Sequence, residues 1–121
     1  MRTVRQEGEN DCGVACVAML ADVTYAEAAA VIYPNGRSKL TKTKDLHRAL
    51  KILGKKPLTE RRKALGSKAL TDLPHSALIF VEMDDGNASK HWVVWDAQAR
   101  KVRDPYHKSH KHRYRGYLMV E

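Results

Sequence analysis

The chain has 121 residues, which is enough for one compact domain and too few for two separate hydrophobic cores. Hydrophobic residues make up 43% of it and charged residues 30%, which excludes a chain that is disordered by composition. The formal charge of +8 suits a polyanionic partner such as nucleic acid, but it equally serves solubility. No apolar run reaches the length of a membrane span, and the first residues lack the hydrophobic stretch of a signal peptide. We therefore expect one cytoplasmic domain over residues 1–121, working as a monomer.

The first half of the sequence predicts helices. They are expected over residues 12–20, 24–32 and 43–53. Asn10 or Asp11 can cap the first helix, and Thr24 and Glu27 have the spacing of a capping box at the start of the second. In the third helix apolar residues recur at helical spacing, and Gly54 is a plausible terminator.

The second half predicts strands, over residues 77–83, 91–96, 101–104 and 117–120. Residues 84–87 supply a turn after the first strand, and Pro105 stops the third. Residues 55–76 are basic, have prolines near both margins, and favour no single element. Helices followed by antiparallel strands predict the α+β fold class.

Cys12 and Cys16 are the only cysteines, and on a helix they share one face. A disulfide between them would strain the helix, and zinc would need further sulfur or nitrogen ligands nearby in sequence, so we expect free thiols. Cys12, in the first helical turn, faces unpaired backbone N–H groups and the positive end of the helix dipole. Both favour thiolate over thiol, which suits a nucleophile. The alternative is a small buried apolar residue, which is the role we expect for Cys16.

A thiolate nucleophile needs a base, and the base needs a group that orients it. His91 opens an apolar strand. If a two-residue turn joins residues 91–96 to 99–104 in a hairpin, His91 lies opposite Asp104 on the same face. Asp96 then leaves the opposite face, which makes Asp104 the better candidate. The alternatives are a strand-edge histidine bonded to solvent and an aspartate that merely ends a strand.

Two short motifs, in this order, resemble a known family. The first is Gln6, followed by Asp11, Cys12, Gly13, Ala15, Cys16 and Met19; the second is His91-Trp92-Val93-Val94, followed by Asp104-Pro105. In order and rough spacing they are similar to the bacteriocin-processing, double-glycine leader peptidases, which are papain-like cysteine peptidases.

The resemblance implies a papain-like α+β domain, with amino-terminal helices packed on a carboxy-terminal antiparallel sheet. Cys12 would be the nucleophile, His91 the general base and then acid, and Asp104 the group that orients the imidazole. Gln6 would donate its side-chain amide to the oxyanion, beside the backbone N–H of Cys12. The implied reaction is cleavage of a peptide or isopeptide bond without a cofactor. The substrate would be a Gly-Gly leader or another small protein, since the chain carries no exporter module.

A rival reading rests on the basic segments. His107, His110 and His112 lie among Lys, Arg and Tyr residues near the carboxy terminus. Such a cluster can bind a transition metal, but the interleaved cations oppose one, so we expect a solvated basic loop and no metal. The same loop could contact phosphates and stack on bases. A nucleic-acid-binding module with a structural cysteine, or an inactive papain-like adaptor, is therefore the alternative to a peptidase.

Overall fold

The computed structural model describes residues 1–8, 10–36, 41–83, 89–106 and 112–121. Over these residues the fold class is α+β, as the sequence predicts: three helices are followed by an antiparallel sheet of five strands. The helices are α1 (Cys12–Ala21), α2 (Tyr25–Ile32) and α3 (Thr43–Ile52), and a 3₁₀ helix, η1, spans Leu70–Asp72. The strands are β1 (Lys63–Ala64), β2 (Ala77–Met83), β3 (Lys90–Asp96), β4 (Lys101–Arg103) and β5 (His112–Met119).

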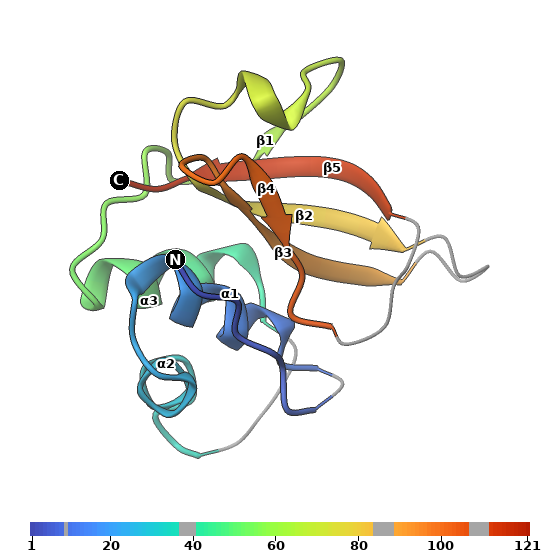
Figure 1. Ribbon diagram of the computed structural model, residues 1–121. Helices are drawn as coiled ribbons and strands as arrows, with labels where there is room; N and C mark the ends of the chain where they lie inside the picture. Colours follow the sequence, from blue (N-terminus) through green and yellow to red (C-terminus); the bar gives the residue numbers. More distant parts are fainter. Residues whose placement is uncertain (9, 37–40, 84–88, 107–111) are drawn as a thin grey trace.

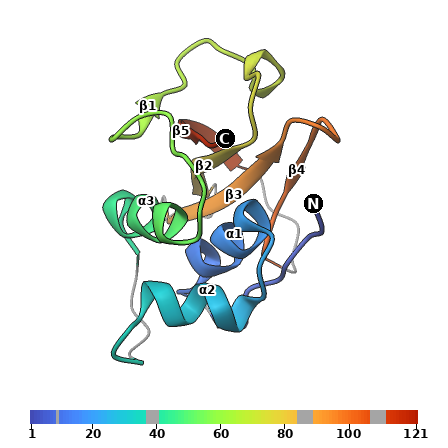
Figure 2. The ribbon, with the colours of Figure 1, turned by 90° about the vertical axis from the view of Figure 1, so that its left-hand side faces the viewer.

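The sheet has the order β1-β5-β2-β3-β4, and each neighbouring pair of strands is antiparallel. Figures 1 and 2 show α1, α2 and α3 on one side of it. The central strand β2 is apolar throughout residues 77–81 because alternate side chains enter two different cores. Leu78 packs with the helices, whereas Ile79 packs with Leu65 and Leu73 from the segment that precedes the strand. Both faces of the sheet are therefore covered.

Two regions differ from what the sequence predicts. Residues 55–76, for which no element was favoured, contain the short elements β1 and η1. β5 begins at His112, well before the expected strand at 117–120. The first half of β5 carries charge instead of an apolar face, so hydropathy does not reveal it. It is a strand because its backbone pairs with β2, and Arg115 also forms an ion pair with Glu82 at 3.1 Å.

The hairpin between β3 and β4 has a wider turn than the predicted two-residue one. Val94 pairs with Arg103, which leaves a four-residue connection, 97–100, between Asp96 and Lys101. The carboxylate of Asp96 accepts hydrogen bonds from two backbone N–H groups of this connection, at 3.1 and 3.2 Å. The two-residue turn is wrong because tight hairpin turns need left-handed residues such as Asn or Gly, which the chain lacks at this point.

Asp104 lies one residue beyond the end of β4, where the described residues form no strand pairing. Its approach to His91 therefore depends on the turn that follows β4 and not on the register of the hairpin.

Helix α1 is buried at every position and packs against α2, α3 and β3. Gly13 in α1 lies against the start of α3, where a Cβ would lie 2.4 Å from Thr41 Oγ1 and 3.0 Å from Leu46 Cδ2. Only glycine fits this contact without a shift of its neighbours. Within the described ranges no single helix is long and apolar enough to cross a membrane, although α1 and α2, bent by 115°, meet that test as a pair.

We predict that Gly13→Ala destabilises the protein by about 1–3 kcal/mol, because the added methyl group overpacks the contact with Thr41 and Leu46. Urea denaturation would measure the loss. The double variant Gly13→Ala/Thr41→Ala should recover part of it, since the closest atom is removed. On helix propensity alone alanine would stabilise α1 by about 1 kcal/mol. A Gly13→Ala protein at least as stable as the wild type would therefore contradict the contact.

Candidate active site

Cys12 is the first residue of α1 and is 7% exposed. The expected cap from Asp11 is wrong: Asp11 occupies the N-cap position, but its side chain makes no capping hydrogen bond. Its buried carboxylate instead accepts hydrogen bonds from Glu7 N (3.1 Å), Gly8 N (2.8 Å) and the Tyr25 hydroxyl. Asp11 therefore fixes the loop that leads to Cys12 and leaves the first N–H groups of the helix without a side-chain cap. These groups remain available to stabilise negative charge near Cys12.

His91 and Asp104 meet as expected. The imidazole Nε2 lies 2.8 Å from Asp104 Oδ1, and because a carboxylate only accepts hydrogen bonds, Nε2 carries the hydrogen. His91 is 6% exposed, and the described part of β4 pairs only with residues 94–96. The first part of β3, which carries His91, therefore has no strand partner on that side among the described residues. Cys12 lies close enough to the His91 ring to raise the pKa of the imidazole.

The carboxylate of Asp104 is held in place by the turn that follows it. Its Oδ1 also accepts a hydrogen bond from Tyr106 N at 2.9 Å, two residues along the chain. This is an Asx turn, and Pro105 between them has no N–H group to compete for the carboxylate. The ring of Tyr106 also packs edge-on to the His91 ring, with centroids 6.2 Å apart. The Asp-Pro pair therefore orients the carboxylate in addition to ending the strand.

The His91 imidazole has a strongly perturbed pKa. Burial lowers this pKa, but hydrogen bonds to Asp104 and Cys12 and the negative charges of both raise it by more, to about 9 from an ordinary value of 6.5. At neutral pH the ring is therefore an imidazolium. A positive charge there stabilises an anion on Cys12, which is the electrostatic arrangement that a thiolate nucleophile needs.

Gln6 forms hydrogen bonds both with the turn that carries Asp104 and with the loop that leads to Cys12. Its backbone N–H donates to the carbonyl of Pro105 at 2.9 Å, next to Asp104. Its side-chain Nε2 donates to the carbonyl of Gly8 at 2.7 Å, in the loop that Asp11 holds. An amide nitrogen has two hydrogens, so one remains for a further acceptor. Its buried Oε1 has no hydrogen-bond partner among the described residues.

Cys16 serves as an internal comparison for Cys12. It is completely buried one turn deeper in α1, and both cysteines are free thiols. Burial raises the pKa of the Cys16 thiol well above its ordinary value, and the charges of Cys12 and Asp104 raise it further. A thiol in this position is inert, in agreement with the packing role expected from the sequence.

Arg5 is a site residue that sequence reasoning missed. Its Nη1 donates to the carbonyls of Asp104 (3.0 Å) and Tyr106 (2.8 Å), so one guanidinium holds both ends of the Asx turn. Nearby, Arg103 donates to the hydroxyl of Thr3 at 2.9 Å. No sequence pattern reveals contacts between segments at opposite ends of the chain; the only available signal is that Arg5 directly precedes Gln6.

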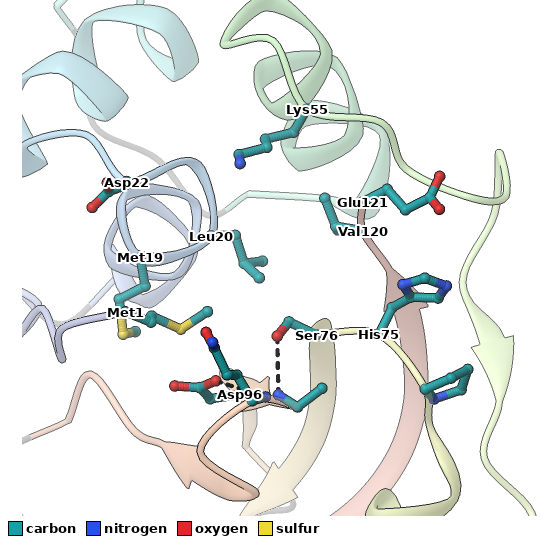
Figure 3. Close-up of a pocket in the computed structure, with 13 residues that line it drawn as sticks. Met1, Met19, Leu20, Asp22, Lys55, His75, Ser76, Asp96, Val120 and Glu121 are labelled. Carbon is teal, nitrogen blue, oxygen red and sulfur yellow. Dashed lines mark hydrogen bonds between the residues drawn. The ribbon is translucent and has the colours of Figure 1, made fainter.

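A cavity of about 520 Å³ lies at the ends of α1 and β3, whereas Cys12 and His91 lie at the starts of these elements. Figure 3 shows its lining, which includes Met19 and Leu20 from α1 and Asp96 from β3. Its ionic groups are of both signs, and Asp96 is already engaged with Arg103 Nε at 2.8 Å. The cavity contains none of the predicted site residues, so the chemistry of Cys12 does not depend on it.

The histidine-rich segment lies mostly outside the described residues, which exclude His107 and His110. The backbone of His112 starts β5, so the expected solvated loop is wrong for its last residues, 112–115. Among the residues that the structure describes, no group of three or more His, Cys, Asp or Glu side chains could hold a metal ion.

Comparison with known proteins adds no relative to this description. No protein-family model and no curated protein sequence matches the chain. The site must therefore be interpreted from its own geometry.

We predict that Asp104→Asn lowers the pKa of His91 from about 9 toward 6.5, because the neutral amide removes the charge and the strongest hydrogen bond that raise it. A pH titration of the His91 ring signals by NMR would measure the change. Asp96→Asn is the matched control, since that carboxylate bonds to Arg103 and to the turn. If both variants leave His91 unchanged, or shift it equally, Asp104 does not set its protonation.

Proposed function

We propose that this protein is a thiol-dependent peptidase in which Cys12, His91 and Asp104 form the catalytic triad. The observation that carries the proposal is the His91 ring, which lies 2.8 Å from Asp104 and whose pKa is raised by both Asp104 and Cys12. The nucleophile comes from the start of a helix, the base from a strand, and the orienting carboxylate from the turn after the next strand. Each lies within reach of the next, which is the requirement for an activated nucleophile.

The first half of the reaction is acylation. The Cys12 thiolate attacks the carbonyl carbon of the scissile bond, and the carbonyl oxygen becomes an oxyanion. In this proposal the backbone N–H of Cys12 and the second amide hydrogen of Gln6 donate to it. Collapse of the tetrahedral intermediate breaks the C–N bond, and the His91 imidazolium gives its proton to the leaving amine. A thioester on Cys12 remains.

The second half is hydrolysis of that thioester. His91, now neutral, takes a proton from a water molecule, whose oxygen attacks the thioester carbonyl. The second tetrahedral intermediate collapses to a carboxylic acid and the Cys12 thiolate, with His91 protonated again. Asp104 keeps the ring in the required tautomer throughout. No metal or organic cofactor takes part in these steps.

The resemblance to the bacteriocin-processing peptidases supports the same roles for Gln6, Cys12, His91 and Asp104, and suggests a papain-like arrangement. It also suggests a peptide substrate cleaved after a Gly-Gly pair. The proposal does not require that sequence, because the chemistry resides in the triad and applies to any peptide or isopeptide carbonyl that reaches Cys12.

We predict that iodoacetamide alkylates Cys12 much faster than Cys16 at neutral pH. The reason is that the His91 imidazolium lies beside Cys12, whereas burial raises the pKa of the Cys16 thiol. Mass spectrometry of peptides after timed alkylation would measure both cysteines, with Cys16 as the unreactive internal control. His91→Gln should slow the alkylation of Cys12. If Cys12 reacts equally fast in this variant and in the wild type, the His91 imidazolium does not activate Cys12, and the proposed ion pair between them is wrong.

We also predict that Cys12→Ala abolishes hydrolysis while Cys16→Ala retains it. A library of internally quenched fluorogenic peptides, including members with an internal Gly-Gly pair, would detect the activity. Gln6→Ala should lower kcat by about 100-fold or more, since loss of one oxyanion donor has this effect. Hydrolysis that persists in Cys12→Ala, or that is absent from the wild-type protein on every peptide, would overturn the proposed activity.

A further inference from the structure

A groove lined mainly by cations runs beside α3. It consists of two hollows of about 330 Å³ each, which share the lining residue Glu60 and which we together call the basic groove. Their lining residues are Thr43, Lys44, His47, Lys51, Lys55, Lys56, Pro57, Glu60, Arg61 and Arg62. Six of these are lysine or arginine and only Glu60 is acidic. The triad uses none of them.

The charge in the groove is not neutralised internally. Among the described residues, the only carboxylate contact along it is that of Glu60 with His47, at 3.7 Å, and the Glu60 side chain is 85% exposed. The four groove lysines and Arg61 form no ion pair with any described residue. Cations gathered in a concave surface without counter-charges raise the local concentration of anionic ligands. The groove is therefore suited to a ligand that carries several negative charges.

One end of the groove lies near the elements that carry Cys12 and His91. Thr43, in its lining, starts α3, and Thr41 just before it lies against Gly13 of α1. The Arg62 guanidinium lies 5.9 Å from the ring of Trp92 in β3. A polypeptide substrate can therefore extend from the groove toward the elements that carry the triad.

The lining favours an acidic peptide over a nucleic acid. Proteins that bind single-stranded nucleic acid stack bases on aromatic rings, but no Phe, Tyr or Trp lines the groove. The nearest ring, Phe80, is covered by the guanidinium of Arg62, 3.8 Å from its centroid. α3 is about 15 Å long at 1.5 Å per residue, which matches about five residues of extended peptide. Short acidic side chains at this spacing can reach the lysines along the helix.

We propose that the basic groove binds an acidic segment of the substrate polypeptide and so directs acidic substrates to Cys12. This inference rests on the proposed peptidase function. Lys44 and Arg62 receive the part of the segment nearest the scissile bond, and Lys51 and Lys56 receive the more distant part.

Binding can be tested without catalysis in the Cys12→Ala protein, by fluorescence anisotropy with a labelled hexaglutamate peptide. Lys51→Glu/Lys56→Glu should weaken binding about tenfold or more. Lys68→Glu/Lys101→Glu is the matched control, because it changes the net charge equally at exposed positions outside the groove. If both pairs of substitutions weaken binding equally, or if the peptide does not bind at all, the basic groove is not a site for an acidic peptide. A labelled oligouridylate that binds more tightly than the peptide, and is lost with the groove pair, would overturn the peptide assignment.

The two proposals fail in different ways. If the catalytically intact protein cleaves peptides with and without an adjacent acidic segment equally well, and the groove variants do not change kcat/KM, the peptidase stands and the groove inference falls. If no peptide is cleaved but hexaglutamate binding depends on the groove pair, the peptidase falls and the groove remains an acidic-peptide site. An acidic segment that raises kcat/KM about tenfold, only in proteins with an intact groove, supports both.

Discussion

The hydrogen bond between His91 and Asp104 is the interaction on which the rest of the site depends. It fixes the orientation of a ring whose pKa Cys12 also raises, so a strand residue and a helix residue act on each other. Arg5 and the backbone of Gln6 hold the turn that carries Asp104. Both residues belong to the segment that leads to Cys12. The amino-terminal segment thus positions the nucleophile and the carboxylate together, and a disturbance of either reaches both.

Much of this could be predicted from the sequence because local rules apply to it. Hydrophobic periodicity reveals α3, a β-branched apolar run reveals β2, and the capping box of Thr24 and Glu27 forms as expected. The contact of His91 with Asp104 was predicted from a hairpin register that is wrong. The contact forms nevertheless, because Asp104 lies beyond the paired part of β4 and the following turn, closed by Tyr106 N, orients its carboxylate.

Other features could not be predicted because they depend on contacts between distant segments. Asp11 has the residue type and position of a helix cap, yet its carboxylate serves the preceding loop and Tyr25 instead. The first half of β5 lacks the apolar alternation of a strand and is determined by its pairing with β2. Arg5 acts through carbonyl groups, which any residue in the turn would offer, so its role leaves no trace in residue types. The cations of the basic groove are likewise visible in the sequence only as scattered charge.

The perturbed pKa of His91 has a consequence for the order of events that we propose. The pKa of about 9 depends partly on the hydrogen bond and the negative charge of Cys12 and partly on those of Asp104. Attack on the carbonyl bonds the Cys12 sulfur to carbon and makes it neutral, which removes the first contribution and leaves the second. Burial lowers the pKa of the imidazole, and only the hydrogen bond and charge of Asp104 now raise it. The ring therefore releases its proton more readily. The ring is thus an acid when the leaving amine needs a proton and becomes a base when water must lose one. The switch needs no conformational change, because the charge that drives it is created and removed by the reaction itself.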